Sequence, residues 1–125
     1  MNKTILQIGG IDIPKGVIKD IEIELPKLYN LPASIPTHVI RGKRSGPTVF
    51  ISAAIHGDEL NGIEIIPRIK NLPALKKLKG TRLLVPVVNV YGLSTLSRYF
   101  PDRRELNRIF PGSSKGSLAA GTATI

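Results

Sequence analysis

The chain has 125 residues, the size of one domain, and can bury roughly two thirds of the surface that its unfolded form exposes. It contains no cysteine, which excludes disulfides and thiolate zinc ligands and leaves His, Asp and Glu to hold any metal ion. No stretch reaches the ~20 consecutive apolar residues that span a bilayer, and residues 1–10 lack the layout of a signal peptide. A cytoplasmic protein without a membrane partner is therefore expected.

The net charge of +9 is compatible with a nucleic-acid partner, because clustered Lys and Arg attract phosphate groups. The cations are instead spread over separate groups, at residues 15–19, 41–44, 76–79 and 98–108. Only Tyr99 and Phe100 place aromatic side chains beside one of these groups. We therefore predict no nucleic-acid partner and expect the positive charge to favour a small anionic substrate.

The first third of the chain has the pattern of β-strands. Residues 17–25 alternate apolar and polar side chains with a period of two, which predicts a half-exposed strand. Residues 35–40 predict a second strand, placed near a sheet edge because Pro36 cannot donate a backbone hydrogen bond. Residues 41–47 then supply the Gly, Ser and Pro typical of a turn.

The middle of the chain has the pattern of an α/β unit. Residues 48–55 are a continuous apolar run, which predicts a strand covered on both faces. Residues 58–70 carry apolar side chains at helical spacing and predict an amphipathic helix that Pro67 kinks or ends. Residues 81–88 predict another strand, in which Pro86 requires an edge position or a bulge. Strand, helix and strand in this order predict a right-handed crossover with a parallel pair.

An imidazole and a carboxylate three positions apart follow the first of these apolar runs, as His56 and Glu59. Both are good zinc ligands, and a catalytic zinc takes three protein ligands and leaves one position for water. Gly57 allows a sharp turn between them. The pair also recurs by chance, and a histidine at a strand end is more often only hydrogen-bonded. The carboxyl end of a strand is, however, where α/β folds place their ligands.

Residues 89–116 contain no run long enough to predict an element, and a loop of this length in a compact domain is usually functional or disordered. Its centre concentrates fork-shaped donors suited to carboxylates or oxyanions, namely Arg98, Arg103, Arg104, Asn107 and Arg108. The alternative is that these arginines are solvated, or that Arg108 pairs with Glu105 or Asp102. The combination with the metal half-site, formed by His56 and Glu59, favours an anion-holding loop.

These two motifs, in this order, resemble the succinylglutamate desuccinylase and aspartoacylase family, which comprises zinc-dependent relatives of the M14 carboxypeptidases. The first is Ile55-His56-Gly57-Asp58-Glu59-Leu60, and the second runs from Ser97-Arg98-Tyr99-Phe100 through Glu105-Leu106-Asn107-Arg108 to Ile109-Phe110-Pro111-Gly112. The resemblance extends from about residue 35 onward. It implies a partial zinc-carboxypeptidase-like mixed sheet with flanking helices, preceded by a β-rich N-terminal segment.

The resemblance also implies roles for individual residues. It makes His56 and Glu59 the zinc ligands and makes Asn107 and Arg108 the pair that holds the substrate carboxylate. Arg98 is the nearest match to the arginine that polarises the scissile carbonyl, with Arg103 or Arg104 as the alternatives. Glu105 stands where many relatives carry aspartate.

The third zinc ligand and the general base of the family have no counterpart in this sequence. The family's third ligand is a histidine downstream of the second motif, but no histidine follows His56. His38 is the only other histidine, and Glu64 would point away from the metal on an ordinary helix. We therefore interpret residues 1–125 as a single, shortened zinc-hydrolase-like domain. Its β-rich segment is 1–45, and residues 46–125 carry the metal half-site and the substrate-binding loop.

The expected function is that of a zinc-dependent deacylase cleaving the amide bond of small anionic N-acyl amino acids, with Zn²⁺ as cofactor. One alternative is an M14-type carboxypeptidase acting on peptides, and another is a non-catalytic anion-binding module. A parallel sheet cut partway leaves an unpaired strand, so we also expect that the chain forms a homo-oligomer through an exposed sheet edge.

Overall fold

The computed structural model describes residues 5–27, 30 and 32–125. Its strands are β1 (Leu6–Ile8), β2 (Ile11–Ile13), β3 (Ile18–Glu24), β4 (Ser34–Arg41), β5 (Arg44–Ser52) and β6 (Lys79–Val85). Its helices are α1 (Asn61–Lys70), η1 (Pro73–Lys77), α2 (Val90–Ser94), η2 (Leu106–Arg108) and α3 (Leu118–Thr122), of which η1 and η2 are 3-10 helices. The 3-10 helix η1 lies in the connection between α1 and β6.

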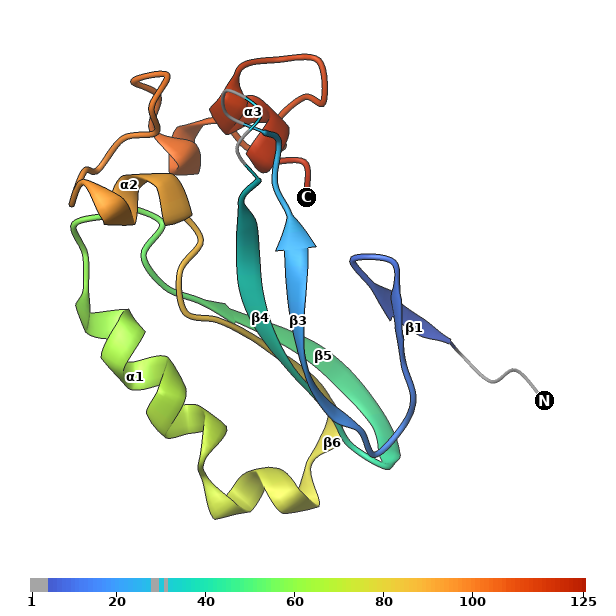
Figure 1. Ribbon diagram of the computed structural model, residues 1–125. Helices are drawn as coiled ribbons and strands as arrows, with labels where there is room; N and C mark the ends of the chain where they lie inside the picture. The colour runs from blue at the N-terminus through green and yellow to red at the C-terminus, as the bar shows by residue number, and fades with distance from the viewer. Residues whose placement is uncertain (1–4, 28–29, 31) are drawn as a thin grey trace.

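A four-stranded mixed sheet in the order β3-β4-β6-β5 forms the centre of the molecule (Figure 1). Neighbouring residues of β4 point to opposite faces of this sheet. Val39 packs with the β1–β2 hairpin, whereas Ile40 packs with Ile66 of α1. The α/β class, with a mixed sheet, flanking helices and a β-rich N-terminal segment, is confirmed. Residues 1–4, 28, 29 and 31 of that segment lie outside the described residues.

Strands β3 and β4 pair antiparallel along the whole length of β3, which confirms the half-exposed strand predicted there. The prediction that β4 lies at an edge is wrong, because β4 lies between β3 and β6. Pro36 is tolerated because β6 pairs only with residues His38–Arg41 of β4. The proline therefore lies in the part of the strand that has a single neighbour.

The predicted crossover is confirmed, because β5 pairs parallel to β6 and α1 lies between them in the chain. Helix α1 begins at Asn61, three residues later than predicted, and Pro67 lies inside it without ending it. Ile66 and Ile69 flank this proline and pack against the sheet. Burial of these two side chains stabilises the last turn of the helix and offsets the loss of the hydrogen bond that the proline removes.

Strand β5 is one of the two edge strands of the sheet in the described part of the chain. It pairs with β6 alone. Val49 and Phe50 are neighbours on opposite faces and are 37% and 59% exposed. The prediction that this strand is covered on both faces is therefore wrong. Its apolar pattern is that of an internal strand, but the described residues supply a neighbour on one side only.

The segment after β6 has more structure than its sequence pattern indicates. It contains α2, η2 and α3, each of five residues or fewer. These short elements are held by a shared cluster of buried side chains, Phe100, Leu106 and Ala119. The ring of Phe100 also lies edge-on to Tyr91, with ring centroids 5.5 Å apart. Among the described residues, no helix is long and apolar enough to span a membrane.

Candidate functional site

The loop between β5 and α1 carries His56 and Glu59 at the carboxyl end of β5. Backbone hydrogen bonds fasten the start of this loop to the segment after β6, from Val88 N–H to the carbonyl of Ala53 and from Asn89 N–H to that of Ala54, each 3.0 Å. Ala54 has a φ of 51°, a left-handed conformation that is uncommon for a residue with a side chain. It redirects the chain two residues before His56.

Gly57 brings this loop into direct backbone contact with α2. Its N–H donates to the carbonyl of Ser97 at 2.8 Å. A Cβ atom at Gly57 would lie 2.2 Å from the carbonyl carbon of Gly92, so no other residue fits without moving one of the two segments. The predicted turn at Gly57 is present, and the close approach of α2 is the stronger reason for glycine.

Both ring nitrogens of His56 are engaged. Its Nδ1 lies 2.9 Å from Glu59 Oε1, and its Nε2 lies 2.9 Å from Glu105 Oε1 and 3.3 Å from Asn107 Oδ1. The residue is 5% exposed. Burial opposes protonation of the ring, but hydrogen bonds with Glu59 and Asn107 outweigh it, and the pKa of His56 is raised above its ordinary value.

Glu105 lies at the centre of the site. Besides His56, it accepts hydrogen bonds from Arg98 Nη2 at 2.5 Å and from Arg108 Nε at 3.0 Å. Its side chain is 13% exposed, which opposes ionisation, but the two arginines outweigh this effect and hold the pKa of Glu105 below its ordinary value. One ionised carboxylate therefore positions an imidazole and two guanidinium groups.

The contacts of His56 are compatible with a metal on its Nδ1 side. Glu105 and Asn107 accept from Nε2–H, and Glu59 accepts from Nδ1–H when the ring is protonated. Loss of the Nδ1 proton would leave a lone pair beside Glu59, a second good zinc ligand, while Nε2–H keeps its acceptors. Among the described residues, no group of three or more His, Cys, Asp or Glu is arranged to hold a metal ion. The donor chemistry thus fits two ligands of a site.

The structure brings together all five residues singled out by the sequence, His56, Glu59, Arg98, Asn107 and Arg108. Arg98 also lies 3.8 Å from Glu59 through Nη1, so it bridges the metal half-site and Glu105. Arg103 and Arg104, the alternatives to Arg98, are exposed, and neither side chain forms an ion pair with the described residues of this cluster. The alternative pairing of Arg108 with Glu105 is also observed, as part of the same cluster.

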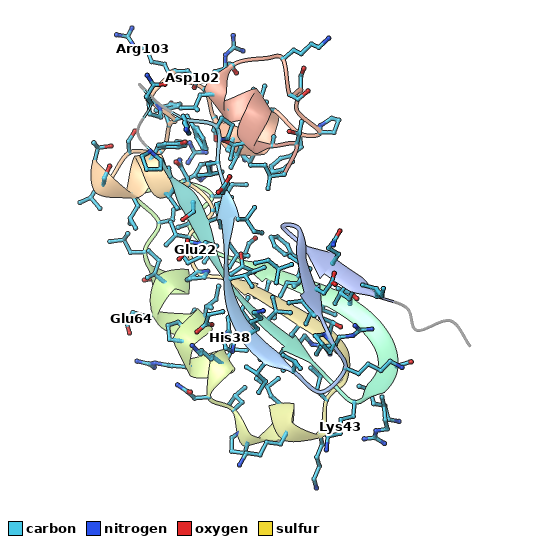
Figure 2. All side chains as sticks on the ribbon, turned by 45° about the vertical axis from the view of Figure 1, so that its right-hand side comes forward. Glu22, His38, Lys43, Glu64, Asp102 and Arg103 are labelled. Carbon is cyan, nitrogen blue, oxygen red and sulfur yellow. The ribbon has the colours of Figure 1, made fainter. Side chains whose placement is uncertain are left out.

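The other two candidates lie outside this cluster. His38 contacts Asp20 on the neighbouring strand, a hydrogen bond that lowers the pKa of Asp20, and Lys70 lies 3.6 Å from the same carboxylate. Glu64 is exposed and faces Arg68 across one turn of α1. Figure 2 shows His38 beside α1 and Glu64 on the outside of that helix, away from Asp102 and Arg103.

Two residues of the site region were not singled out as site residues from the sequence. Glu105 was noted only as a departure from the family's aspartate and as an alternative partner of Arg108. Asn89 is fully buried and caps α2 by accepting from Gly92 N–H at 2.7 Å. Asn before a short helix is a cap signal, but α2 itself was not predicted.

A hollow of about 670 Å³ opens beside Glu59. It is lined by the end of β5 and by the loop that leads into α1, over residues 52–55 and 58–62. This volume falls within the range of about 300–1,000 Å³ typical of small-molecule sites. The hollow borders the open edge of the sheet.

Comparison with known proteins places this arrangement in a family. Residues 45–124 match the family model of the succinylglutamate desuccinylase/aspartoacylase catalytic domain. The chain is 32% identical to the N-alpha-acetyl-L-2,4-diaminobutyric acid deacetylase of Halomonas elongata over 85 residues. This matched segment covers 67% of this chain and 25% of that protein.

Two solved structures share the fold. A succinylglutamate desuccinylase/aspartoacylase from Rhodobacter sphaeroides has a TM-score of 0.77 at 28% identity, covering 86% of this chain and 34% of that one. The product-bound ectoine utilization protein EutE (DoeB) from Ruegeria pomeroyi has a TM-score of 0.76 at 28% identity, with the same coverage. The chain thus spans about a third of their length. Since the matched segment contains both motifs and every residue of the cluster around Glu105, the chain belongs to the succinylglutamate desuccinylase/aspartoacylase family.

Proposed function

We propose that these residues form part of the active site of a zinc-dependent hydrolase that cleaves the amide bond of N-acyl amino acids. The observation that carries the proposal is the convergence of His56, Glu59, Arg98, Asn107 and Arg108 around Glu105. Membership of a family whose relatives include a deacetylase supports the reaction class.

In this proposal His56 and Glu59 hold the zinc ion, which when bound polarises the scissile carbonyl and lowers the pKa of a water ligand. Arg98 lies next to this pair and is fixed by Glu105 at 2.5 Å. A guanidinium held in place before reaction can stabilise negative charge as it develops on the carbonyl oxygen. Arg98 is thus the proposed catalytic residue.

Asn107 and Arg108 are the proposed substrate-binding pair. Arg108 uses Nε to reach Glu105, which leaves its two terminal nitrogens for a carboxylate, and its side chain is 73% exposed. Asn107 accepts from His56 through Oδ1, which leaves its amide group as a donor. These neighbours position the carboxylate of the substrate close to the metal half-site, and they make a small anionic N-acyl amino acid the proposed partner.

The proposal assigns the third zinc ligand and the general base to polypeptide outside this sequence, since no histidine follows His56. The chain spans 25% of the Halomonas deacetylase and 34% of the Rhodobacter structure.

We propose the cytoplasm as the compartment, which the absence of cysteine supports.

Substrate recognition can be tested on this chain by NMR titration with an N-acetyl amino acid in the presence of zinc. We expect saturable shifts of the backbone amides at Arg98, Asn107 and Arg108. The methyl amide of the same ligand, which lacks the carboxylate, should bind at least about tenfold more weakly, because it leaves the guanidinium of Arg108 unpaired.

Arg68→Gln is the control for Arg108→Gln, since the side chain of Arg68 on α1 is 82% exposed, against 73% for Arg108. Only the Arg108 variant should lose the shifts. Tighter binding of a dipeptide than of the N-acetyl amino acid would favour the carboxypeptidase alternative. Equal binding of acid and methyl amide would contradict the proposed carboxylate site.

We also propose that the open edge of β5 supports self-association of this chain. Its regular stretch, residues 48–52, has no charge and no proline, the devices that normally protect an edge strand. We expect sedimentation velocity to show a larger species as concentration rises. Phe50→Lys should return the chain to monomer, whereas Ile65→Lys, on the exposed side of α1, should not. A monomer at every concentration would exclude this interface.

A further inference from the structure

Two hollows at the end of the sheet opposite the candidate site share the turn between β4 and β5. One, of about 300 Å³, lies between this turn and η1, and the other, of about 260 Å³, lies between the turn and the N-terminal hairpin. Their cationic lining residues, which we name the basic end, are Lys15, Arg41, Lys43, Arg44, Lys76 and Lys77. Among the described residues, no acidic and no aromatic side chain lines either hollow.

Most of these cations have no carboxylate partner in the described part of the chain. Lys15, Lys43, Arg44, Lys76 and Lys77 form no ion pair there. The sequence explains this arrangement, because it has no Asp or Glu between Glu24 and Asp58 or between Glu64 and Asp102. The cations of the basic end come from those two acid-free stretches, except for Lys15.

Backbone contacts hold these segments together. Gly42 N–H donates to the carbonyl of Gly80 at 2.8 Å, and Gly16 N–H donates to the carbonyl of Gly42 at 3.3 Å. A Cβ atom at Gly42 would lie 2.1 Å from the carbonyl oxygen of Leu78, so the turn and the start of β6 are in van der Waals contact. The cations are therefore gathered on a preformed frame, and a ligand need not order the backbone.

Two of the cationic side chains are also fixed in place. Arg44 Nη2 donates to the carbonyl of Lys77 at 3.4 Å, and Lys15 Nζ donates to Ser45 Oγ at 3.0 Å. These partners are neutral, so the contacts position the charges without neutralising them. The remaining mutual repulsion is relieved when an anion enters.

We propose that the basic end binds a small multivalent oxyanion of the phosphate class. A monovalent carboxylate would neutralise only one of the gathered charges, whereas a multivalent oxyanion accepts from several donors at once, including the planar fork of an arginine. The lack of aromatic side chains in the lining removes the stacking platform that single-stranded nucleic acid uses. Lys43 and Arg103 lie at opposite ends of the molecule in Figure 2, so this site is separate from the cluster around Glu105.

The test is a titration of the zinc-free chain with inorganic pyrophosphate at low ionic strength, followed by NMR and calorimetry. We expect saturable binding with shifts at the amides of Gly16, Gly42 and Gly80, and weaker binding as salt is added. The double variant Lys43→Gln/Lys76→Gln should lose at least about tenfold in affinity, because it removes two charges that face the anion.

The matched control is Arg103→Gln/Lys115→Gln, which removes the same charge from exposed positions at the other end of the chain. Its affinity should stay within about twofold of the parent, since screening limits interaction over that distance. Equal losses in both double variants, non-saturable binding, or shifts centred on Arg98 to Arg108 would each overturn the proposal. The NMR spectra also report whether each variant remains folded.

Discussion

Replacing His56 with alanine should abolish stoichiometric zinc retention by this chain. The imidazole supplies one of the two proposed ligands, and its loss leaves Glu59 alone, with a 57% exposed side chain. We expect zinc affinity to fall more than about 100-fold. Loss of a residue that only hydrogen-bonds to a ligand costs about 10–100-fold, and loss of the ligand itself should cost more. Glu59→Gln should have a comparable effect. Equilibrium dialysis with elemental analysis measures both variants.

His38→Ala is the matched control, because His38 is a second partly buried histidine that contacts a carboxylate elsewhere on the sheet. Its zinc content should equal that of the parent. Protons compete with zinc at His56. Because the pKa of His56 is raised, zinc retention should fall as the pH drops toward and below that pKa. Unchanged zinc in His56→Ala and Glu59→Gln, or the same loss in His38→Ala, would contradict the assignment of these ligands.

Gly57→Ala should weaken both the fold and the metal half-site. The added methyl group would overlap the backbone of Gly92, since a Cβ atom would come within 2.2 Å of its carbonyl carbon. Relief of this overlap requires that the loop of His56 and α2 move apart. We expect the free energy of unfolding to fall by about 1–3 kcal/mol, the usual cost of overpacking, and zinc affinity to fall with it.

Leu84→Ala separates these two effects. Leu84 is fully buried in β6, where it packs with Ile40 and Ile66. Its truncation should cost about 2–5 kcal/mol of unfolding free energy through the cavity it leaves. Urea unfolding and zinc titration of the folded protein should show a loss of stability alone. Normal zinc affinity in Gly57→Ala would show that the close approach of α2 does not position His56.

Strand β3 and helix α1 were predictable because their periodicities are long and local. The period of two in β3 and the helical spacing of α1 each extend over several residues and depend on one buried face. The edge position assigned to β4 failed because Pro36 reports on one residue's hydrogen bonding, whereas the strand's neighbours depend on topology. The elements α2 and α3 are too short to show a period, and they depend on packing around Leu106.

In the candidate site, too, local features were predictable from the sequence and long-range contacts were not. Residue types and spacing singled out His56 and Glu59 as a pair, because both belong to one loop. The resemblance to a family then supplied Asn107 and Arg108. Glu105 was not predicted as the centre, since its importance depends on contacts with residues 49 positions away in the sequence. Such a contact is set by the packing of the long segment after β6, which no local pattern specifies.

The open edge of β5 has a consequence for the assembly of the proposed active site. Ser52 ends the strand and also lines the hollow beside Glu59. A polypeptide strand that extended the sheet along β5 would pass the mouth of that hollow and wall it on its solvent side. The same added strand would then complete the sheet and enclose the hollow. The proposed active site would therefore become catalytically competent only when the sheet is fully assembled.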